Sequence, residues 1–147
     1  SPDGTRIVYR AHHPADSAQL ADYRRLLDQN MVRPSRVELY VMNADGSDQR
    51  QVTALGGANF GPSWTPDGKR IIFSSNHKTP RGGNFDLFLV DASASRATTD
   101  QVEQLTFSPV FDGFPMFSPD GKKLLWASNR HDAKPNETNL FLADWQQ

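Results

Sequence analysis

The sequence predicts an all-β fold, a β-propeller of four-stranded antiparallel blades that carries one inserted amphipathic helix. A turn motif of the form Ser/Thr-Pro-Asp-Gly, followed by an apolar run, occurs three times, beginning at Ser1, Thr65 and Ser118. A second apolar motif follows each copy, at equal spacing in the second and third copies, around Leu39, Leu87 and Leu140. Short apolar runs between turn residues are typical of β-strands, and a repeated four-strand unit is typical of a propeller blade.

The middle unit shows how the residues define the four strands. Residues 60–64 form a candidate inner strand, and residues 65–68 form a tight turn with proline second and glycine fourth. Residues 70–74 and 85–90 are rich in β-branched and aromatic side chains, which favour strands. Residues 101–106 complete the unit as its outer strand. Aromatic residues recur at one strand position and are expected to pack between blades: Tyr9, Phe73 and Trp126.

The other two units each lack one strand. The first begins at its second strand, and the third ends after residues 139–143 without an outer strand. We divide the chain into blades at residues 1–57, 58–107 and 108–147, with a helical insertion at 14–34 in the first. Three blades fall short of the ~4–8 that close a ring. We therefore expect the C-terminal part of a propeller of six or more blades, with a homodimer that closes a six-bladed ring as the alternative.

The insertion is expected to contain an amphipathic helix over residues 17–31. Asp16 suits the N-cap, with Gln19 as its partner three residues on, and Pro34 ends the helix. The apolar residues of the segment fall on one stripe, at Leu20, Tyr23, Leu27 and Met31. We expect this helix to pack on the propeller rim, or alternatively to act as a lid or a partner-binding element.

Composition narrows the classes of function. The 147 residues carry a net charge of -1, so the chain has no overall positive charge that would attract a nucleic-acid backbone. The absence of cysteine excludes a disulfide framework, a cysteine-ligated zinc site and a thiol nucleophile. No apolar run approaches the ~20 residues that a membrane-spanning helix needs. We therefore expect neither a nucleic-acid partner nor a membrane span.

One face of the predicted propeller carries a repeating polar signature. In an antiparallel blade, the long connections and the loops between blades lie at the end opposite the Ser/Thr-Pro-Asp-Gly turns. The polar residues at this end are His12, His13, Asn59, Asn76, His77, Asp112, Asn129 and Arg130. Loops on a rigid scaffold are the usual seat of recognition, so we expect these residues to form a binding face. The alternative is that they cap the loops and satisfy turn backbones.

Neither a metal site nor a catalytic constellation is expected. Four histidines could converge on a metal ion: His12, His13, His77 and His131. However, Arg130 occupies the repeat position of His77, and a fixed positive charge there disfavours a cation. The chain contains no Gly-x-Ser-x-Gly nucleophile motif, and its paired glycines lack the strand-to-helix context of a phosphate-binding loop. We therefore expect no cofactor and no metal.

Several segments carry a family resemblance. Residues 62–73 (PSWTPDGKRIIF), together with residues 43–47 and 104–106, resemble the WD40-like repeat of TolB-type β-propellers. The resemblance covers nearly the whole chain apart from the insertion. It implies a propeller fold and a bacterial periplasmic or secreted setting. Such propellers occur as protein-binding modules and as gating domains of prolyl-oligopeptidase-like enzymes, so the fold alone does not fix the function.

These observations lead to one prediction of function and one alternative. We expect a non-catalytic TolB-like scaffold that binds a protein partner or a small ligand through its polar loops. The alternative is a substrate-gating propeller of a prolyl-oligopeptidase-like or other hydrolase whose catalytic domain is missing from this chain.

Overall fold

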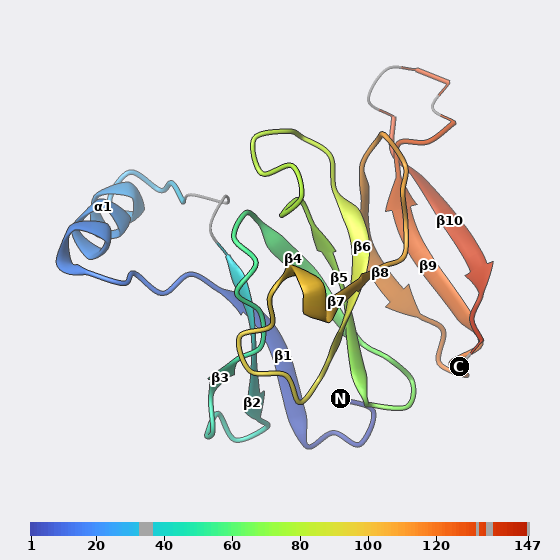
Figure 1. Cartoon of the computed structure of the whole chain (residues 1–147), viewed down its shortest axis with the longest axis horizontal. Coiled ribbons are helices and arrows are strands. Elements are labelled where there is room, and N and C mark those ends of the chain that lie inside the picture. Colours follow the sequence, from blue (N-terminus) through green and yellow to red (C-terminus); the bar gives the residue numbers. More distant parts are fainter. Residues whose placement is uncertain (33–36, 132, 135–136, 147) are drawn as a thin grey trace.

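Three antiparallel sheets follow one another along the chain in the computed structural model, which describes residues 1–32, 37–131, 133–134 and 137–146 (Figure 1). Sheet 1 contains β1 (Arg6–Ala11), β2 (Glu38–Asn43) and β3 (Arg50–Gln51). Sheet 2 contains β4 (Asn59–Trp64), β5 (Arg70–Ser75), β6 (Asp86–Asp91) and β7 (Val102–Gln104). Sheet 3 contains β8 (Asp112–Phe117), β9 (Lys123–Ser128) and β10 (Asn139–Asp144). This arrangement confirms the predicted all-β propeller fold.

The described strands of sheets 1 and 3 number three each, whereas sheet 2 has four. Among the described residues, none forms an inner strand beside β1 or an outer strand beside β10, in line with the sequence expectation. Each sheet falls within one of the three predicted blades, whose exact boundaries stay predictions. Two of the predicted boundaries lie outside the described part of the chain. They are the end of the insertion at residues 33–34 and the end of the third blade at residue 147.

The three Ser/Thr-Pro-Asp-Gly turns share one pattern of hydrogen bonds. The Gly68 N–H donates to the Thr65 carbonyl at 2.8 Å, and equivalent bonds of 2.9 Å close the first and third turns. The Asp67 carboxylate accepts from the Thr65 hydroxyl at 2.6 Å and from the Lys69 N–H at 3.0 Å. These bonds favour the charged carboxylate and hold the pKa of Asp67 below its usual value. Because all three turns share this pattern, the turn aspartates have a structural role.

The turn glycines offer a matched test of how neighbouring turns pack. Gly4 and Gly121 have φ angles of 71° and 70°, which L-residues adopt only with strain. A Cβ atom at Gly121 would lie 2.7 Å from the Pro66 Cβ, whereas one at Gly4 would meet nothing within 4 Å. We expect Gly4→Ala to lower the free energy of unfolding by about 1 kcal/mol. Gly121→Ala should cost about 1–3 kcal/mol more, because it adds a clash to the same strain.

Chemical denaturation of the two variants measures this difference directly. Equal losses at Gly4 and Gly121 would contradict a tight contact between the second and third turns.

Two interfaces between sheets form the hydrophobic core. One face of sheet 2 packs against Leu39 and Val41 of sheet 1, through Ile71, Phe73, Phe88 and Val90. The opposite face of sheet 2 packs against Leu124 of sheet 3, through Ile72, Leu87 and Leu89. Successive strand residues point to opposite faces, which is why the continuous apolar runs of β5 and β6 serve both interfaces. We call the face that meets the preceding sheet the leading face, and the opposite one the trailing face.

The outer strands are shorter than predicted. β3 covers only Arg50–Gln51 of the expected residues 49–53, and β7 covers Val102–Gln104 of the expected 101–106. A 3₁₀ turn, η1 (Thr99–Gln101), precedes β7. The chain after β6 folds back along β3, where Ala97 forms a parallel bridge with Thr53 and the Arg50 guanidinium donates to the Ala94 carbonyl at 2.7 Å. This contact between units lies where β3 stops.

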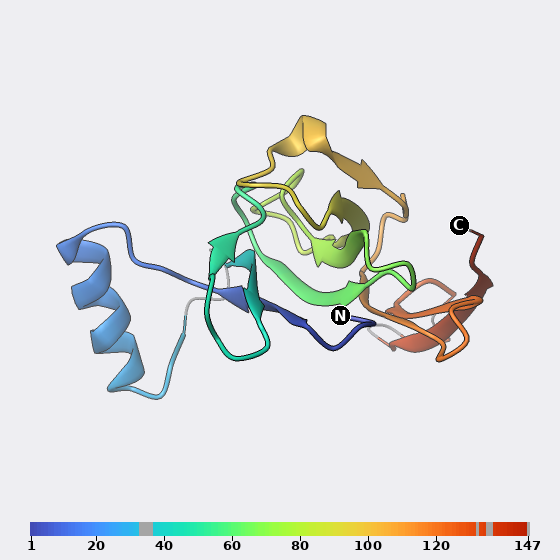
Figure 2. The same ribbon diagram turned by 90° about the horizontal axis from the view of Figure 1, so that it is seen from below.

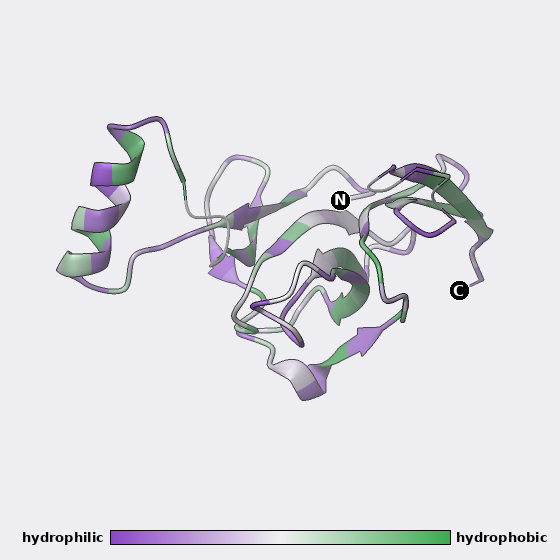
Figure 3. Cartoon of the chain, turned by 90° about the horizontal axis from the view of Figure 1, so that it is seen from above, coloured by the Kyte–Doolittle hydropathy of each residue, from purple (hydrophilic) through white to green (hydrophobic). Residues whose placement is uncertain are grey.

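Helix α1 (Ser17–Leu27) starts as predicted and ends earlier. Asp16 is the N-cap, and its carboxylate accepts from the Gln19 N–H at 2.8 Å. The helix ends at Leu27 instead of Met31, because the chain reverses at Asn30, whose φ is 56°. Figures 2 and 3 show α1 standing apart from the three sheets, so it does not pack on the rim. Its role as a lid or a partner-binding element stays a prediction.

Candidate functional site

The long connections lie at one end of the sheets, opposite the three Ser/Thr-Pro-Asp-Gly turns. Figure 1 shows the segments after β5 and β9 and the stem of the insertion at this end. We call it the loop face and define it by residues 11–15, 56–58, 76–84, 105–111 and 129–131. Two clefts open among these segments and the strands next to them.

The first cleft has a volume of about 700 Å³ and lies between the insertion stem and the neighbouring loops. His12 and His13 line it from the stem, Glu38 and Tyr40 from β2, and Arg96 from the segment after β6. The imidazole of His13 contacts the ring of Tyr40 in a tilted arrangement, with ring centres 4.6 Å apart. Burial, and then the charge of Glu38, raises the pKa of Tyr40 above its usual value. The phenol is therefore neutral near pH 7.

The Glu38 carboxylate at the base of the first cleft is occupied by protein donors. It accepts from the Thr53 hydroxyl at 2.7 Å, from the Gly56 N–H at 2.8 Å and from the Asn59 side-chain amide at 3.1 Å. The Arg96 guanidinium makes one hydrogen bond within the described part of the chain, to the side-chain oxygen Oε1 of Gln51 at 2.5 Å. A guanidinium carries five N–H donors, so Arg96 has donors left for a ligand. The first cleft therefore presents the remaining guanidinium donors of Arg96 beside a carboxylate that protein groups already occupy.

The second cleft has a volume of about 590 Å³ and lies between the loop at residues 105–110 and the end of β9. Asn129, Arg130 and His131 line one side of it. Phe107 lines the other side, and this side chain is 76% exposed. An exposed aromatic ring and an arginine that line the same cleft are residue types that recognition surfaces often use.

Four of the predicted site residues are buried instead of exposed. Asn59 and Asp112 are fully buried, and Asn76 and His77 are each 9% exposed. The Asn76 side-chain oxygen accepts from the Ala58 N–H at 2.8 Å and so holds the loop before β4. These four residues join the strands beneath the loop face.

Asn59, Ser75 and His77 form a chain of hydrogen bonds within sheet 2. The Ser75 hydroxyl donates to the Asn59 side-chain oxygen at 2.6 Å and lies 2.9 Å from His77 Nδ1. Since that hydroxyl hydrogen is already used, Nδ1 must carry the proton and donate to Ser75. Burial, assisted by the Lys78 charge, lowers the pKa of His77, so its ring is neutral near pH 7. The group is thus a neutral structural network.

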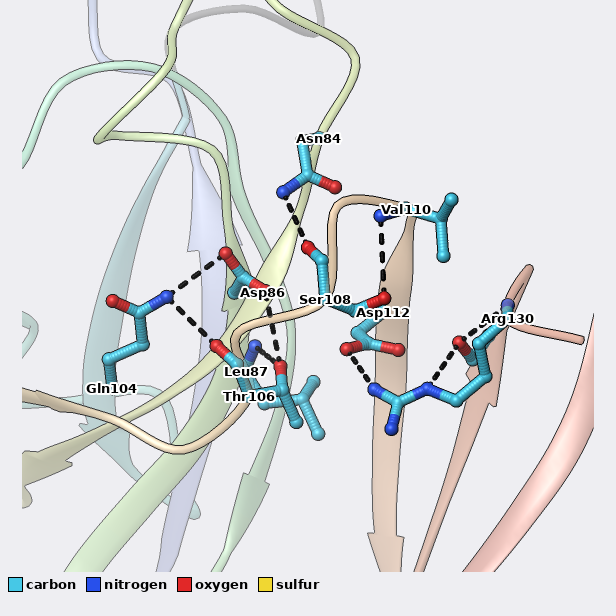
Figure 4. A network of polar contacts seen from close by, with 10 residues as sticks. Asn84, Asp86, Leu87, Gln104, Thr106, Ser108, Val110, Asp112 and Arg130 are labelled. Carbon is cyan, nitrogen blue, oxygen red and sulfur yellow. Dashed lines mark hydrogen bonds and ion pairs between the residues drawn. The ribbon is translucent and has the colours of Figure 1, made fainter.

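Asp112, Ser128 and Arg130 occupy the equivalent positions in sheet 3 (Figure 4). Asp112 Oδ2 pairs with the Arg130 guanidinium at 2.5 Å, and the Arg130 Nε–H donates to the Ser128 hydroxyl at 3.0 Å. Only 28% of the Arg130 side chain is exposed, whereas the Asp112 side chain is fully buried. Sheet 3 therefore replaces the neutral amide and imidazole of sheet 2 by an ion pair.

Asp86 lies near this ion pair. In the repeat it is equivalent to Glu38 of sheet 1. Its carboxylate accepts from the Gln104 amide at 3.0 Å and from the Thr106 hydroxyl at 3.4 Å (Figure 4). Burial, and then the negative charge of Asp112, raises the pKa of Asp86. Because the folded chain favours the protonated form, the contribution of Asp86 to stability declines as the pH rises through its folded pKa.

The eight predicted residues thus separate into two groups. His12, His13, Asn129 and Arg130 line the two clefts, whereas Asn59, Asn76, His77 and Asp112 lie buried beneath the loop face. The proposed binding role of the whole set stays a prediction. Sequence reasoning missed the cleft residues Glu38, Tyr40 and Arg96. The repeat could have indicated Glu38, because an acidic residue precedes the apolar motif in two units, as Glu38 and Asp86. Arg96 has no equivalent in the other units, so the sequence offered no indication of it.

Two further features bear on the candidate chemistry. The described residues include no group of three or more histidine, aspartate or glutamate side chains that could hold a metal ion. None of the helices that the structure describes has the length and apolar character to cross a lipid bilayer.

Comparisons with known proteins identify related chains and folds. An uncharacterized protein of Agrobacterium fabrum is 32% identical over 109 residues, which cover 74% of this chain and 34% of that protein. Dipeptidyl-peptidase 5 of Porphyromonas gingivalis is 32% identical over 87 residues, covering 56% of this chain and 12% of the peptidase. The uncharacterized peptidase YuxL of Bacillus subtilis is 24% identical, with 96% of this chain and 23% of that protein covered. No family model matches the chain.

Solved structures support the same fold. An Agrobacterium tumefaciens protein assigned as TolB is 26% identical, with a TM-score of 0.65, and the match covers 98% of this chain and 43% of that one. TolB from Acinetobacter baumannii is 23% identical, with a TM-score of 0.58, over 95% of this chain and 28% of that one. The chain spans about a third or less of the length of the curated relatives it matches.

Proposed function

We propose that this chain, which has the TolB-type β-propeller fold, is a non-catalytic scaffold that binds a protein partner or a small ligand at its loop face. The observation that carries the proposal is the first cleft, with a volume of about 700 Å³ and polar side chains from the stem, β2 and the segment after β6. Ligand sites of proteins usually measure ~300–1,000 Å³ and combine apolar walls with a few placed polar groups.

The donors of the first cleft define what it would recognise. The Glu38 carboxylate is occupied by Thr53, Gly56 and Asn59, so it orders the cleft floor. Arg96 and His13 then offer N–H donors to a ligand that brings acceptors, such as the carbonyl groups of an extended peptide. A protein segment is the favoured occupant, because the cleft is lined by the insertion stem, β2 and loops of two neighbouring units.

Peptide selection tests this proposal without a known partner. Random peptides are selected on the immobilised chain, and the dissociation constant of the best binder is measured for wild type and variants. We expect Arg96→Gln and His13→Ala each to weaken binding by about tenfold, the effect of losing one good hydrogen bond or ring contact. Lys122→Ala, an exposed change at the third turn, is the matched control and should leave the affinity unchanged.

Two outcomes would contradict the binding role of the first cleft. One is a selected peptide whose affinity is the same for wild type and both cleft variants. The other is an affinity that falls only in the Lys122→Ala control.

The second candidate function is a substrate-gating propeller that accompanies a hydrolase domain. The matches to dipeptidyl-peptidase 5 and to the peptidase YuxL favour it, although they cover only 12% and 23% of those proteins. A hydrolase segment in the same open reading frame would support this candidate over the scaffold. The TolB-type fold favours a bacterial periplasmic or secreted setting in either case.

A further inference from the structure

The Arg96 guanidinium at the first cleft has no carboxylate partner among the described residues. It donates instead to the neutral side-chain oxygen of Gln51. The Glu38 carboxylate of the same cleft already accepts hydrogen bonds from three protein groups. Other cations of the described chain do form ion pairs with carboxylates: Arg25, Arg70, Lys123 and Arg130. The first cleft therefore contains an exposed cation whose charge no carboxylate of the described structure pairs with.

The backbone of Arg96 is held in a strained conformation at this place. Its φ of 53° lies in the left-handed region, which a bulky L-residue adopts only with strain. The Arg96 N–H donates to the Gln51 carbonyl at 3.2 Å, and the Ala97 N–H donates to the Val52 carbonyl at 2.7 Å. These bonds tie the strained segment to the first unit. Strain of this kind collects at ligand sites, which makes Arg96 a candidate recognition residue.

Tyr40 offers a second donor in the first cleft. Its hydroxyl makes no hydrogen bond within the described part of the chain. Because burial, and then the charge of Glu38, raises the pKa of Tyr40, the phenol keeps its proton near pH 7 and is able to donate it. The charge of Arg96 acts on Tyr40 in the opposite direction, so these two groups lie near enough to interact.

We propose that the first cleft recognises a carboxylate of the bound segment, held by the Arg96 guanidinium and the Tyr40 hydroxyl. This inference rests on the binding role proposed above and adds the chemical class of the group that is bound. A guanidinium presents parallel N–H donors that match the two oxygens of a carboxylate. The negative charge of Glu38 repels a ligand carboxylate from the base of the cleft, which directs it to the Arg96 side.

The carboxylate comes from the C-terminus of a peptide or from an aspartate or glutamate side chain. Peptides selected with a free C-terminus distinguish these sources. The best binder is compared with its C-terminal amide and with forms in which each aspartate or glutamate is replaced by its amide. We expect one of these neutral forms to bind the wild-type chain about tenfold more weakly, and that form identifies the carboxylate.

Variants of the cleft then show whether Arg96 and Tyr40 hold this carboxylate. We expect Arg96→Gln to remove the difference in affinity between the charged peptide and its neutral form, as a double-mutant cycle measures. Tyr40→Phe removes only the hydroxyl and should weaken the charged peptide by about three- to tenfold, with the neutral form unchanged. A purely structural role of Arg96 would weaken both peptides equally. Lys122→Ala is again the control that should change neither affinity.

The failure of this inference differs from the failure of the proposed function. Neutral peptides that bind the wild-type chain as tightly as the charged one, while Arg96→Gln and His13→Ala still weaken binding, would overturn the carboxylate and leave the cleft in place. A charge preference that persists in Arg96→Gln would also overturn it. Peptides whose affinity changes in none of the cleft variants would overturn the binding role of the cleft and this inference with it.

Discussion

Arg130→Ala should lower the free energy of unfolding by about 3–5 kcal/mol. Removing one partner of a buried ion pair leaves the other charge without compensation, and this costs more than the pair itself contributes. Here the group left behind is Asp112, which is fully buried and which pairs with Arg130 at 2.5 Å. Its second carboxylate oxygen has no hydrogen-bond partner among the described residues, so no other contact replaces the lost one. Urea denaturation at neutral pH measures the loss.

The chain contains its own control for this prediction. Asp112→Asn combined with Arg130→His converts sheet 3 to the amide and imidazole that Asn59 and His77 provide in sheet 2. We expect the double variant to recover most of the stability that Arg130→Ala loses, because an amide at position 112 can donate to Asp86 as Asn59 donates to Glu38. A double variant as unstable as Arg130→Ala would contradict the equivalence of the two networks.

Phe73→Ala should produce a loss of similar size, about 3–5 kcal/mol, through an unfilled cavity. Phe73 is 0% exposed on the leading face of sheet 2, and its ring centre lies 6.0 Å from that of Phe88. The cavity would lie in the core between sheets 1 and 2, where Leu39 and Val41 also pack. Urea denaturation measures the loss.

Tyr9→Ala is the matched control, because Tyr9 holds the repeat position of Phe73 on the leading face of sheet 1. Its ring stacks on that of Tyr40 at 5.7 Å, and no sheet covers this face in the described structure. We expect a loss of about 1 kcal/mol, the scale of one ring contact. Equal losses of unfolding free energy for Phe73→Ala and Tyr9→Ala would contradict this account. They would mean that burial between two sheets does not decide which of the equivalent aromatic residues stabilise the core.

The repeat explains why much of the fold could be predicted from sequence. Turn residues fix their own geometry through local hydrogen bonds, as Asp67 does with Thr65 and Lys69. The N-cap of α1 is equally local, because Asp16 and Gln19 satisfy each other within one turn. Strands β5 and β6 were recognisable because both of their faces are buried, which requires continuous apolar runs.

The features that sequence missed depend on contacts between units. Residues after β6 run alongside the end of β3 and bond to residues 51–54, and no pattern within the first unit reveals that contact. Burial of Asn59 and Asp112 is also non-local, since each lies at the start of an inner strand that the neighbouring sheet covers. A polar residue at a strand end indicates a loop face, but only the packing shows whether it holds the scaffold or lines a cleft.

The buried networks and the cleft residues have different roles in the proposed function. The networks around Asn59 and Asp112 hold adjacent sheets in place, and the loops above them form the walls of the two clefts. Substitutions at Asp112 or His77 therefore report on stability, whereas His13 and Arg96 report on binding. Rigid support beneath recognition loops is the usual arrangement in scaffold proteins.

The binding role of the loop face is tested most directly by hydrogen–deuterium exchange of the chain with and without its selected peptide. We expect slower exchange at residues 11–15, 56–58 and 94–98, which surround the first cleft, and no change at the turns at 65–69 and 118–122. Protection confined to those turns, or no protection in any part of the chain at saturating peptide, would contradict binding at the loop face.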